Sequence, residues 1–326
     1  MSHRAALVSG TLFALAAGLM WGLIFVAPLL LAAYPPAMLS VGRYLAFGLI
    51  ALPLAWLDRV RIRELTRADW ADALRLALVG NLLYYLLLSS AIQRAGGPLP
   101  TMIIGTLPLV IAVASNRRNR HRDGLLSWRQ LAPSLLLIAA GLALVNRAEL
   151  AQLSPDADRG RYALGALLAV GAMACWTWYP IRNADWLRAH PDRSPSTWAT
   201  AQGLATLPLA LAGALLLAAA SAAGWVDVGG PLGPTPWRFV GLMLVVALLC
   251  SWLGTLCWNE ASQRLPTTLA GQLIVFESLA GLAYAFLLRG QWPPADTLAG
   301  IVLLIAGVAW ALRARPQPVA ADASPA

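Results

Sequence analysis

The octapeptide GLIALPLA at Gly48–Ala55 returns, almost unchanged, as GLATLPLA at Gly203–Ala210. Six of the eight letters are identical, and the two copies are 155 residues apart. The same offset pairs Trp21 with Trp176. Both copies lie inside long apolar stretches, so the repeated segment belongs to the body of the fold. Internal symmetry of this kind indicates that the chain contains one structural unit twice.

The composition excludes a soluble globular protein. The chain has 326 residues, of which 59% are hydrophobic and 12% are charged, whereas charged residues make up about a quarter of a typical soluble domain. The net charge of +9 comes from arginines scattered in short clusters. Nucleic-acid binding needs positive charge gathered on one surface, so we expect no nucleic-acid partner. The cysteines, which we interpret as small core residues without a disulfide or metal pattern, are Cys175, Cys250 and Cys257.

Ten apolar stretches are long enough to cross a bilayer, for which a helix needs about 20 residues. The first follows a short basic start, but its apolar run is longer than the core of a signal peptide. We therefore interpret all ten as membrane helices. The predicted spans are 8–31, 37–57, 73–92, 98–116, 129–146, 162–181, 198–220, 238–258, 267–288 and 296–313.

The arginines predict how these spans are oriented. With the N-terminus in the cytoplasm, alternate loops place 17 arginines on the cytoplasmic side and 6 on the opposite side. Basic residues accumulate in cytoplasmic loops, so we predict that both termini are cytoplasmic. Arg43 belongs to neither set because it lies inside a predicted span.

Further matches extend the repeat over the whole chain. AIQR at Ala91–Arg94 resembles ASQR at Ala261–Arg264, and LLIA occurs at both Leu136–Ala139 and Leu303–Ala306. Each unit then holds five spans, and because five is odd the second unit must enter the membrane from the opposite side. Inverted repeats of this kind are typical of alternating-access transporters. We predict an all-α integral membrane protein with one five-helix repeat at 1–147, a linker at 148–160, an inverted repeat at 161–315 and a disordered tail at 316–326.

Motifs inside the spans point to a known family. They are GLMWG at Gly18–Gly22, GRYLAFGLIALP at Gly42–Pro53, IIGTLPLVIAV at Ile103–Val113, and the GLAL and GVAW ends of the fifth and tenth spans. In their order, spacing and duplication the chain resembles a bacterial member of the drug/metabolite transporter superfamily, in its EamA-like branch, along nearly its full length.

The resemblance implies a basket of ten helices, with helices one to four and six to nine around a central substrate cavity and helices five and ten outside. It also implies a place in the bacterial inner membrane and, most commonly, export of amino acids or related metabolites. The chain departs from the family pattern in two places. NRRNR at Asn116–Arg120 replaces an acidic residue after the fourth span, and FES at Phe276–Ser278 replaces a proline in the ninth.

Arg43 is a candidate substrate-binding residue. It lies about seven residues into the second span, or roughly 10 Å from its outer end at a rise of about 1.5 Å per residue. A charged residue at a helix centre costs about 2.5–3.5 kcal/mol on insertion scales, so it should face the bundle or water. Two interpretations remain open. Arg43 either joins helices by bonding backbone carbonyls or a partner acid, or it binds the carboxylate of an amino or organic acid in bidentate fashion.

Glu277 is the acid that we place deepest in the hydrocarbon zone, near the middle of the ninth span. Burial disfavours its charged form unless a cation lies near it. Three interpretations remain open: a proton-coupling carboxylate, an anchor for a substrate ammonium group, or a structural partner of Arg43.

Polar and aromatic residues inside the spans complete the predicted cavity. Asn81, Tyr84 and Tyr85 share one helical face of the third span, and Trp21 is the repeat counterpart of Trp176. Each of these side chains alone is as consistent with core packing as with binding, but buried Tyr hydroxyl and Trp N–H groups need partners. Together they form a wall suited to a zwitterion with an apolar side chain. The full set is Trp21, Arg43, Asn81, Tyr84, Tyr85, Trp176, Tyr179, Gln202, Thr255 and Glu277.

Two further sets concern the membrane boundary and helix shape. Tryptophans near the span ends are predicted to form the interfacial belt, and prolines within spans are predicted to interrupt helices. The belt set is Trp70, Trp128, Trp186, Trp225, Trp237 and Trp292, and the proline set is Pro28, Pro53, Pro108, Pro180 and Pro208.

Other functions are weighed against export. A flippase or an uptake facilitator would share the fold. A membrane-embedded enzyme is disfavoured because the histidines, His3, His121 and His190, lie in loops or the tail, and no acid pair occurs in the spans. We therefore predict no enzyme activity, no metal site and no cofactor, with proton coupling left open. The expected partners are a small-molecule substrate and the lipid bilayer, and the protein is expected to be a monomer or a homodimer.

Overall fold

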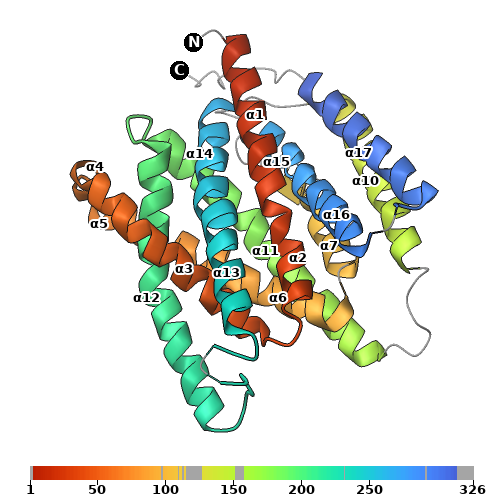
Figure 1. The fold of residues 1–326 in the computed structure, drawn as a ribbon. Coiled ribbons are helices and arrows are strands. Elements are labelled where there is room, and N and C mark those ends of the chain that lie inside the picture. The colour runs from red at the N-terminus through yellow and green to blue at the C-terminus, as the bar shows by residue number, and fades with distance from the viewer. Residues whose placement is uncertain are drawn as a thin grey trace, which may run out of the picture.

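The computed structural model describes residues 3–96, 98–108, 110–111, 114, 127–150, 158–230, 232–290 and 292–313, and the elements in these ranges are all helices (Figure 1). In the first half they are α1 (His3–Trp21), α2 (Leu23–Leu30), α3 (Pro36–Leu57), α4 (Arg59–Arg63), α5 (Arg67–Leu76), the π-helix η1 (Ala77–Leu83), α6 (Tyr84–Ala95), α7 (Pro98–Gly105) and α10 (Trp128–Leu150). In the second half they are α11 (Arg159–Ala189), α12 (Pro195–Ala222), α13 (Pro236–Val246), the π-helix η2 (Ala247–Leu253), α14 (Gly254–Arg264), α15 (Thr267–Leu273), α16 (Val275–Arg289) and α17 (Ala295–Arg313).

Among the described residues, seven helical segments are long and apolar enough to cross a membrane. They correspond to the first, second, third, sixth, seventh, eighth and ninth predicted spans: Arg4–Leu30, Pro36–Leu57, Arg67–Ala95, Arg159–Ala189, Pro195–Ala222, Pro236–Arg264 and Leu269–Leu288. The fifth and tenth predicted spans contain shorter apolar helices, Trp128–Leu144 and Ala295–Gly307. The fourth contains α7, and part of this span lies outside the described residues.

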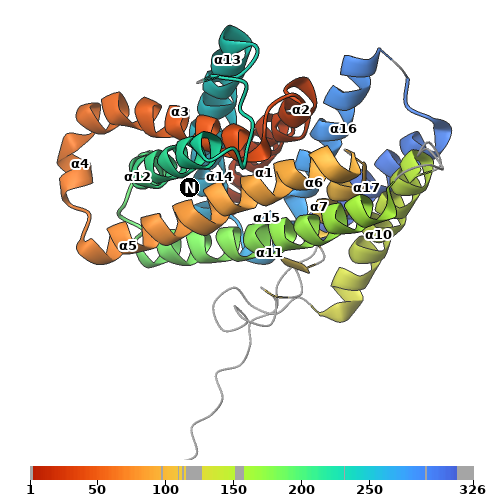
Figure 2. The same ribbon diagram turned by 90° about the horizontal axis from the view of Figure 1, so that it is seen from below.

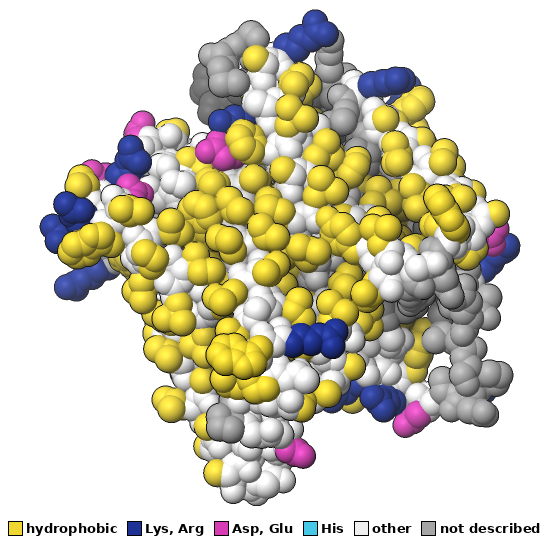
Figure 3. Space-filling view, in the orientation of Figure 1, with side chains coloured by type: hydrophobic (Ala, Val, Ile, Leu, Met, Phe, Trp, Pro, Cys, Tyr) yellow, Lys and Arg dark blue, Asp and Glu magenta, His cyan; other side chains and the backbone are white. Residues whose placement is uncertain are grey.

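The molecule exposes many apolar side chains and buries several polar ones within its hydrophobic core, as expected for a protein that faces lipid. Leucines such as Leu215 and Leu216 on α12 are exposed, whereas the amides of Asn183, Gln202 and Asn259 are fully buried. Figure 3 shows a face covered largely by hydrophobic side chains, with most charged groups near its edges. Water cannot satisfy polar groups in the hydrocarbon region, so such groups must find partners inside the bundle.

The repeated octapeptides lie against each other. α3 packs along α12, and a Cβ on Gly48 would lie 2.6 Å from the Cβ of Leu207 in the second copy. Reciprocally, a Cβ on Gly203 would lie 2.7 Å from the Cβ of Ala51 in the first copy. Small residues allow membrane helices to approach closely, and each copy places its glycine against the other helix.

A second close pair lies at the edge of the molecule. α10 and α17 pack against each other, away from α3, α4 and α12, as Figures 1 and 2 show. A Cβ on Gly141 of α10 would lie 2.6 Å from the carbonyl oxygen of Gly300 on α17.

Two predicted details differ in the structure. The prolines do not end their helices: Pro53, Pro180 and Pro208 lie inside the continuous helices α3, α11 and α12, and Pro28 lies inside α2. A proline removes one backbone donor, and packing by neighbouring helices allows the helix to continue. Within the predicted linker 148–160, residues 148–150 belong to α10 and 159–160 to α11. Asp158 is the N-cap of α11, whereas 151–157, the predicted tail 316–326 and Asn116–Arg120 lie outside the described residues.

Candidate functional site: a closed cavity in the helix bundle

A small cavity lies where helices of both halves of the chain meet. Its volume is about 10 Å³, about enough for a single water molecule. The structure therefore describes a closed state, without room for a substrate at this place. The lining residues are Trp21, Ile24, Arg43, Tyr44, Gly80, Asn81, Tyr84, Trp176, Cys250, Ser251 and Thr255.

Arg43 extends from α3 to this cavity and is only 4% exposed. Its Nε donates a hydrogen bond to Ser251 Oγ at 3.0 Å, and its guanidinium lies 4.5 Å from the centre of the Tyr85 ring. Its Nη1 is buried and has no hydrogen-bond partner among the described residues. A buried cation with an unused donor is costly, because the donor has lost its water. This donor is available to an anion that enters the cavity.

Glu277 lies in the first turn of α16 and is completely buried. Its Oε2 accepts a hydrogen bond from Trp176 Nε1 at 3.2 Å, whereas Oε1 has no partner among the described residues. No ion pair joins Glu277 to Arg43 in the part of the chain that the structure describes. Of the three interpretations of Glu277, a direct ion pair with Arg43 thus has no support from this conformation.

Aromatic rings form one wall of the cavity. Trp176 stacks between Tyr84 and Tyr179, with ring centres 4.7 Å and 5.0 Å apart, respectively. Trp21 meets Trp176 edge to face at 5.0 Å and donates from Nε1 to the carbonyl oxygen of Cys250 at 2.8 Å. Each ring is held by another ring or a hydrogen bond, so the wall has a defined shape.

Most of the predicted site residues lie at the cavity, and the others lie directly behind its wall. Trp21, Arg43, Asn81, Tyr84, Trp176 and Thr255 line it. Behind them, Tyr85 lies against the Arg43 guanidinium and Glu277 bonds Trp176. Tyr179 donates its hydroxyl to Gln202 Oε1 at 2.8 Å, so these two residues support the wall.

Several lining residues were missing from the predicted set. Tyr44 follows Arg43 on α3, and its ring lies 4.9 Å from the guanidinium. Cys250 was interpreted as a core residue, but it lines the cavity and donates from Sγ to the carbonyl oxygen of Met20 at 3.0 Å. Ser251 is the partner of Arg43. Cys250 and Ser251 both belong to the π-helix η2.

Comparison with known proteins identifies the family. A model of the EamA-like transporter family matches residues 8–147. Over 316 residues the chain is 56% identical to "Inner membrane protein YtfF" of Escherichia coli (strain K12), covering 95% of this chain and 97% of that protein. The chain belongs to the EamA-like transporter family. A solved crystal structure shares the fold of this EamA-like transporter, with a TM-score of 0.70 at 18% identity, covering 93% of this chain and 96% of that one.

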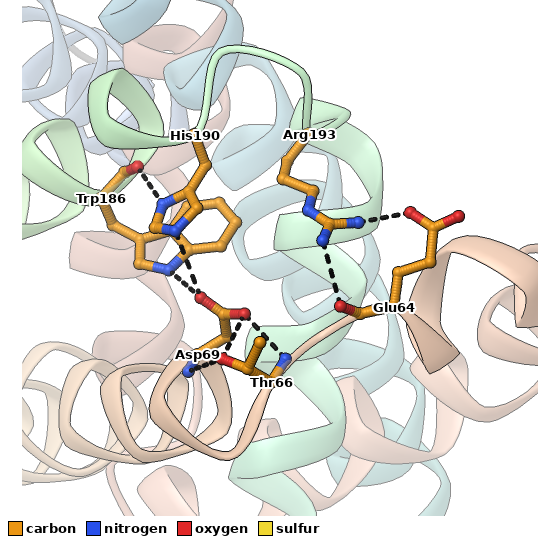
Figure 4. Close-up of polar contacts among 6 residues, drawn as sticks. All are labelled: Glu64, Thr66, Asp69, Trp186, His190 and Arg193. Atoms are coloured by element: carbon orange, nitrogen blue, oxygen red, sulfur yellow. Dashed lines mark hydrogen bonds and ion pairs between the residues drawn. The ribbon is translucent and has the colours of Figure 1, made fainter.

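Beside α4, contacts join the two halves of the EamA-like transporter at what we call the arginine-rich end after Arg59, Arg61 and Arg63. The contacts there, which we call the end cluster, join the start of α5 to the α11–α12 connection (Figure 4). Asp69 Oδ1 accepts a hydrogen bond from Trp186 Nε1 at 2.8 Å, and Asp69 Oδ2 accepts from the Thr66 backbone N–H at 2.8 Å. The end cluster is Glu64, Thr66, Asp69, Trp186, His190 and Arg193.

Trp186 was predicted to lie in the interfacial belt, and that prediction is wrong. The side chain is buried, with its ring stacked 3.5 Å from Trp198 and 4.5 Å from His190. The carboxylate of Asp69 supplies a buried acceptor for the indole N–H, which removes its need for the polar interface. Nearby, Arg193 forms an ion pair with Glu64 and donates from Nη2 to the Glu64 carbonyl oxygen at 3.0 Å.

The EamA-like transporter is also closed at the opposite end, by uncharged groups around Tyr34. Its ring stacks on Phe239 at 4.8 Å, and its hydroxyl accepts a hydrogen bond from the Thr235 backbone N–H at 2.8 Å. Gly233 has a φ of 73°, and a Cβ there would lie 2.2 Å from the Tyr34 ring. A side chain at Gly233 would therefore be strained and would displace Tyr34.

Proposed function

We propose that this transporter exports amino acids or related small metabolites from the cytoplasm by alternating access. The observation that carries the proposal is a pair of buried atoms of opposite hydrogen-bonding character, one on Arg43 at the closed cavity and one on Glu277 directly behind its wall. Among the described residues neither Arg43 Nη1, a donor, nor Glu277 Oε1, an acceptor, has a hydrogen-bond partner, and both are buried. An amino acid carries a carboxylate for the first and an ammonium group for the second, so one zwitterion satisfies both. The aromatic wall suits an apolar side chain.

The proposed architecture is a pair of inverted five-helix repeats. The packing of helices supports it, because contacts recur when the halves are exchanged. The contact of α6 with α11 is matched by the contact of α14 with α1. In the same way, the contact of α7 with α11 is matched by that of α16 with α1, and the contact of η1 with α12 by that of η2 with α3. The π-helices η1 and η2 support it too, because they begin 170 residues apart. Two related units that meet at a central site are the arrangement in which one rocks against the other.

The closed ends fit such a cycle. Tyr34 precedes α3 and the end cluster begins after it, with Arg43 of the cavity between them, and the contacts at each end join the two halves of the chain. Releasing one while the other stays closed would open the cavity to one side of the membrane at a time. We propose that the arginine-rich end is cytoplasmic, because basic residues accumulate on that side.

Reconstituted vesicles can test the substrate class. The assay is counterflow exchange of a labelled apolar amino acid such as leucine, in competition with its amine (no carboxylate) and its carboxylic acid (no ammonium). Each charged hydrogen bond is worth about 1.5–3 kcal/mol. Leucine should therefore compete at least roughly tenfold better than either analogue. Equal competition by the amine or the acid would contradict binding at both Arg43 and Glu277.

A further inference from the structure

A second hollow lies on the outer surface of the protein, away from the central cavity. It is a groove of about 580 Å³ between α3, α12, the α12–α13 connection and Phe239 of α13. Its size is within the range of small-molecule sites, about 300–1,000 Å³. Phe239 is buried and stacks on Tyr34, so these two rings stand between the groove and the interior of the bundle. The groove is therefore distinct from the proposed substrate site.

The groove exists because small residues form its floor. Gly42 on α3 and Ala214 and Ala218 on α12 line it, between larger side chains such as Leu45 and Leu217. Gly42 cannot be larger, because a Cβ there would lie 2.5 Å from the Phe239 ring. An apolar hollow that stays empty loses dispersion contacts along its walls. In a bilayer, the material available to fill it is a lipid acyl chain.

The groove lies at the depth of the upper part of an acyl chain. Ser221 lies at one end and Ala214 is seven residues further into the membrane along α12, or about 10 Å at 1.5 Å per residue. Trp225 and Trp237, on either side of the connection that closes this end, are 83% and 89% exposed. Exposed tryptophans of this kind mark the headgroup level, so the polar end of the groove coincides with lipid headgroups.

The charge at that end indicates which headgroup. The described lining residues include one acid, Asp227, and no base. Asp227 Oδ1 accepts a hydrogen bond from the Gly229 N–H at 2.9 Å, which holds the carboxylate in place. Gly229 and Gly230 have φ values of 64° and 108°, a backbone that folds the connection over the groove. We propose that this groove binds one phospholipid with an ammonium-bearing headgroup, its acyl chain on Gly42, Ala214 and Ala218 and its ammonium group at Asp227.

The test measures which lipid stays bound to the purified full-length protein. The protein is reconstituted with equal amounts of phosphatidylethanolamine and phosphatidylglycerol with identical chains, extracted in mild detergent and measured by native mass spectrometry. One phosphatidylethanolamine molecule should be retained, with about a twofold to fivefold preference over phosphatidylglycerol, as expected for one exposed charge pair. Wild-type protein that retains no lipid, or retains both equally, would overturn the proposal.

Two variants separate the acyl-chain contact from the headgroup contact. Ala218→Trp fills the groove and should abolish retention, whereas Leu215→Trp, at a 73% exposed site one turn away, should not. Asp227→Asn keeps an acceptor for Gly229 and should retain a lipid while losing the preference. Unchanged retention by Ala218→Trp, or an unchanged preference in Asp227→Asn, would refute the assignment. Neither readout depends on the transported substrate.

Discussion

At the scale of single residues, the cavity is defined by what its charged groups leave unused. Arg43 uses Nε on Ser251 and the faces of Tyr85 and Tyr44, yet Nη1 has no partner among the described residues. Glu277 likewise uses one oxygen on Trp176. A direct ion pair between Arg43 and Glu277 would make both groups unavailable to a substrate. Their separate partners, Ser251 and Trp176, hold the two side chains in place and leave one atom of each unused.

Arg43→Lys should leave the protein in the membrane and reduce substrate exchange at least about tenfold. A lysine keeps the positive charge but cannot donate to Ser251 and to a substrate carboxylate in the same fixed plane. The measurement is counterflow in vesicles with equal amounts of protein. Arg238→Lys, at an exposed position on α13, is the matched control and should exchange normally. Normal exchange by Arg43→Lys would indicate that Arg43 is structural.

Glu277→Gln should still exchange substrate, with weaker apparent affinity because the charged acceptor for the ammonium group is lost, and should lose accumulation driven by an imposed pH gradient. The amide keeps an acceptor for Trp176 and fits the same space, but it cannot take up and release a proton as access alternates. Glu260→Gln, which removes an ion pair with Arg264 on α14, serves as control. If Glu277→Gln still concentrates substrate in response to the gradient, Glu277 does not couple transport to protons.

At the scale of helices, two kinds of contact hold the bundle. Glycines allow α3 to approach α12, and α10 to approach α17, because lipid provides little hydrophobic drive for helix association. Polar side chains join α11, α12 and α14: Asn183 Nδ2 donates to Asn259 Oδ1 at 2.8 Å, and Gln202 Nε2 donates to Asn183 Oδ1 at 3.0 Å. This polar network is buried in the second half of the chain, on the side of the cavity near the end cluster.

Gly48→Ala should destabilise the protein by about 1–3 kcal/mol, the usual cost of overpacking. The added Cβ would lie 2.6 Å from the Leu207 Cβ and 3.0 Å from its Cα, so α12 must move. The matched control is Gly241→Ala on α13, where a Cβ would meet no atom of the described residues within 4 Å. This substitution should leave the stability unchanged. Thermal unfolding in detergent compares the two, and equal melting temperatures would contradict the close contact.

Trp186→Phe should open the arginine-rich end more often. Phenylalanine keeps a ring against Trp198 but loses the N–H bond to Asp69, worth about 1.5–3 kcal/mol for a charged acceptor. The native Cys250, buried at the cavity, is the probe after Cys175 and Cys257 are replaced by alanine. Its modification by a maleimide should become about tenfold faster. Trp225→Phe, at an exposed site, should not change the rate, and an unchanged rate in Trp186→Phe would exclude the end cluster as a gate.

At the scale of the whole molecule, the distribution of the arginines and the inverted repeat together predict on which side of the membrane each connection lies. If the second unit is inverted, the connection after α3 and the connection after α12 must lie on opposite sides of the membrane. The structure places the α11–α12 and α12–α13 connections at opposite ends of α12 (Figure 1). Which side of the membrane each of these ends faces is decided when the protein is inserted into the bilayer.

Single cysteines introduced at Arg63 and at Gly224 should be labelled from opposite sides. In intact cells a membrane-impermeant maleimide should reach Gly224→Cys but reach Arg63→Cys only after permeabilisation. Both positions are exposed, so access depends on sidedness rather than on burial. The background carries alanine at the three native cysteines. Labelling of Arg63→Cys in intact cells would reverse the proposed orientation, and labelling of both would exclude opposite sides.

The sequence alone determined the class of the protein and most of its candidate site. Long apolar stretches with few charges can be stable only in lipid, and one buried arginine among them has to face the interior. For this reason Arg43, Trp21 and Trp176 could be located from local pattern and repeat spacing.

Only the tertiary structure decided which groups meet. Trp186 lies near a span end like a belt residue, but the Asp69 carboxylate on another helix provides its partner. Cys250 was interpreted as a core residue, yet it lines the cavity from η2. The absence of an Arg43–Glu277 ion pair among the described residues depends on the distances between α3 and α16. Partners that are distant in sequence are set by helix packing, and a pattern within one helix carries no information about them.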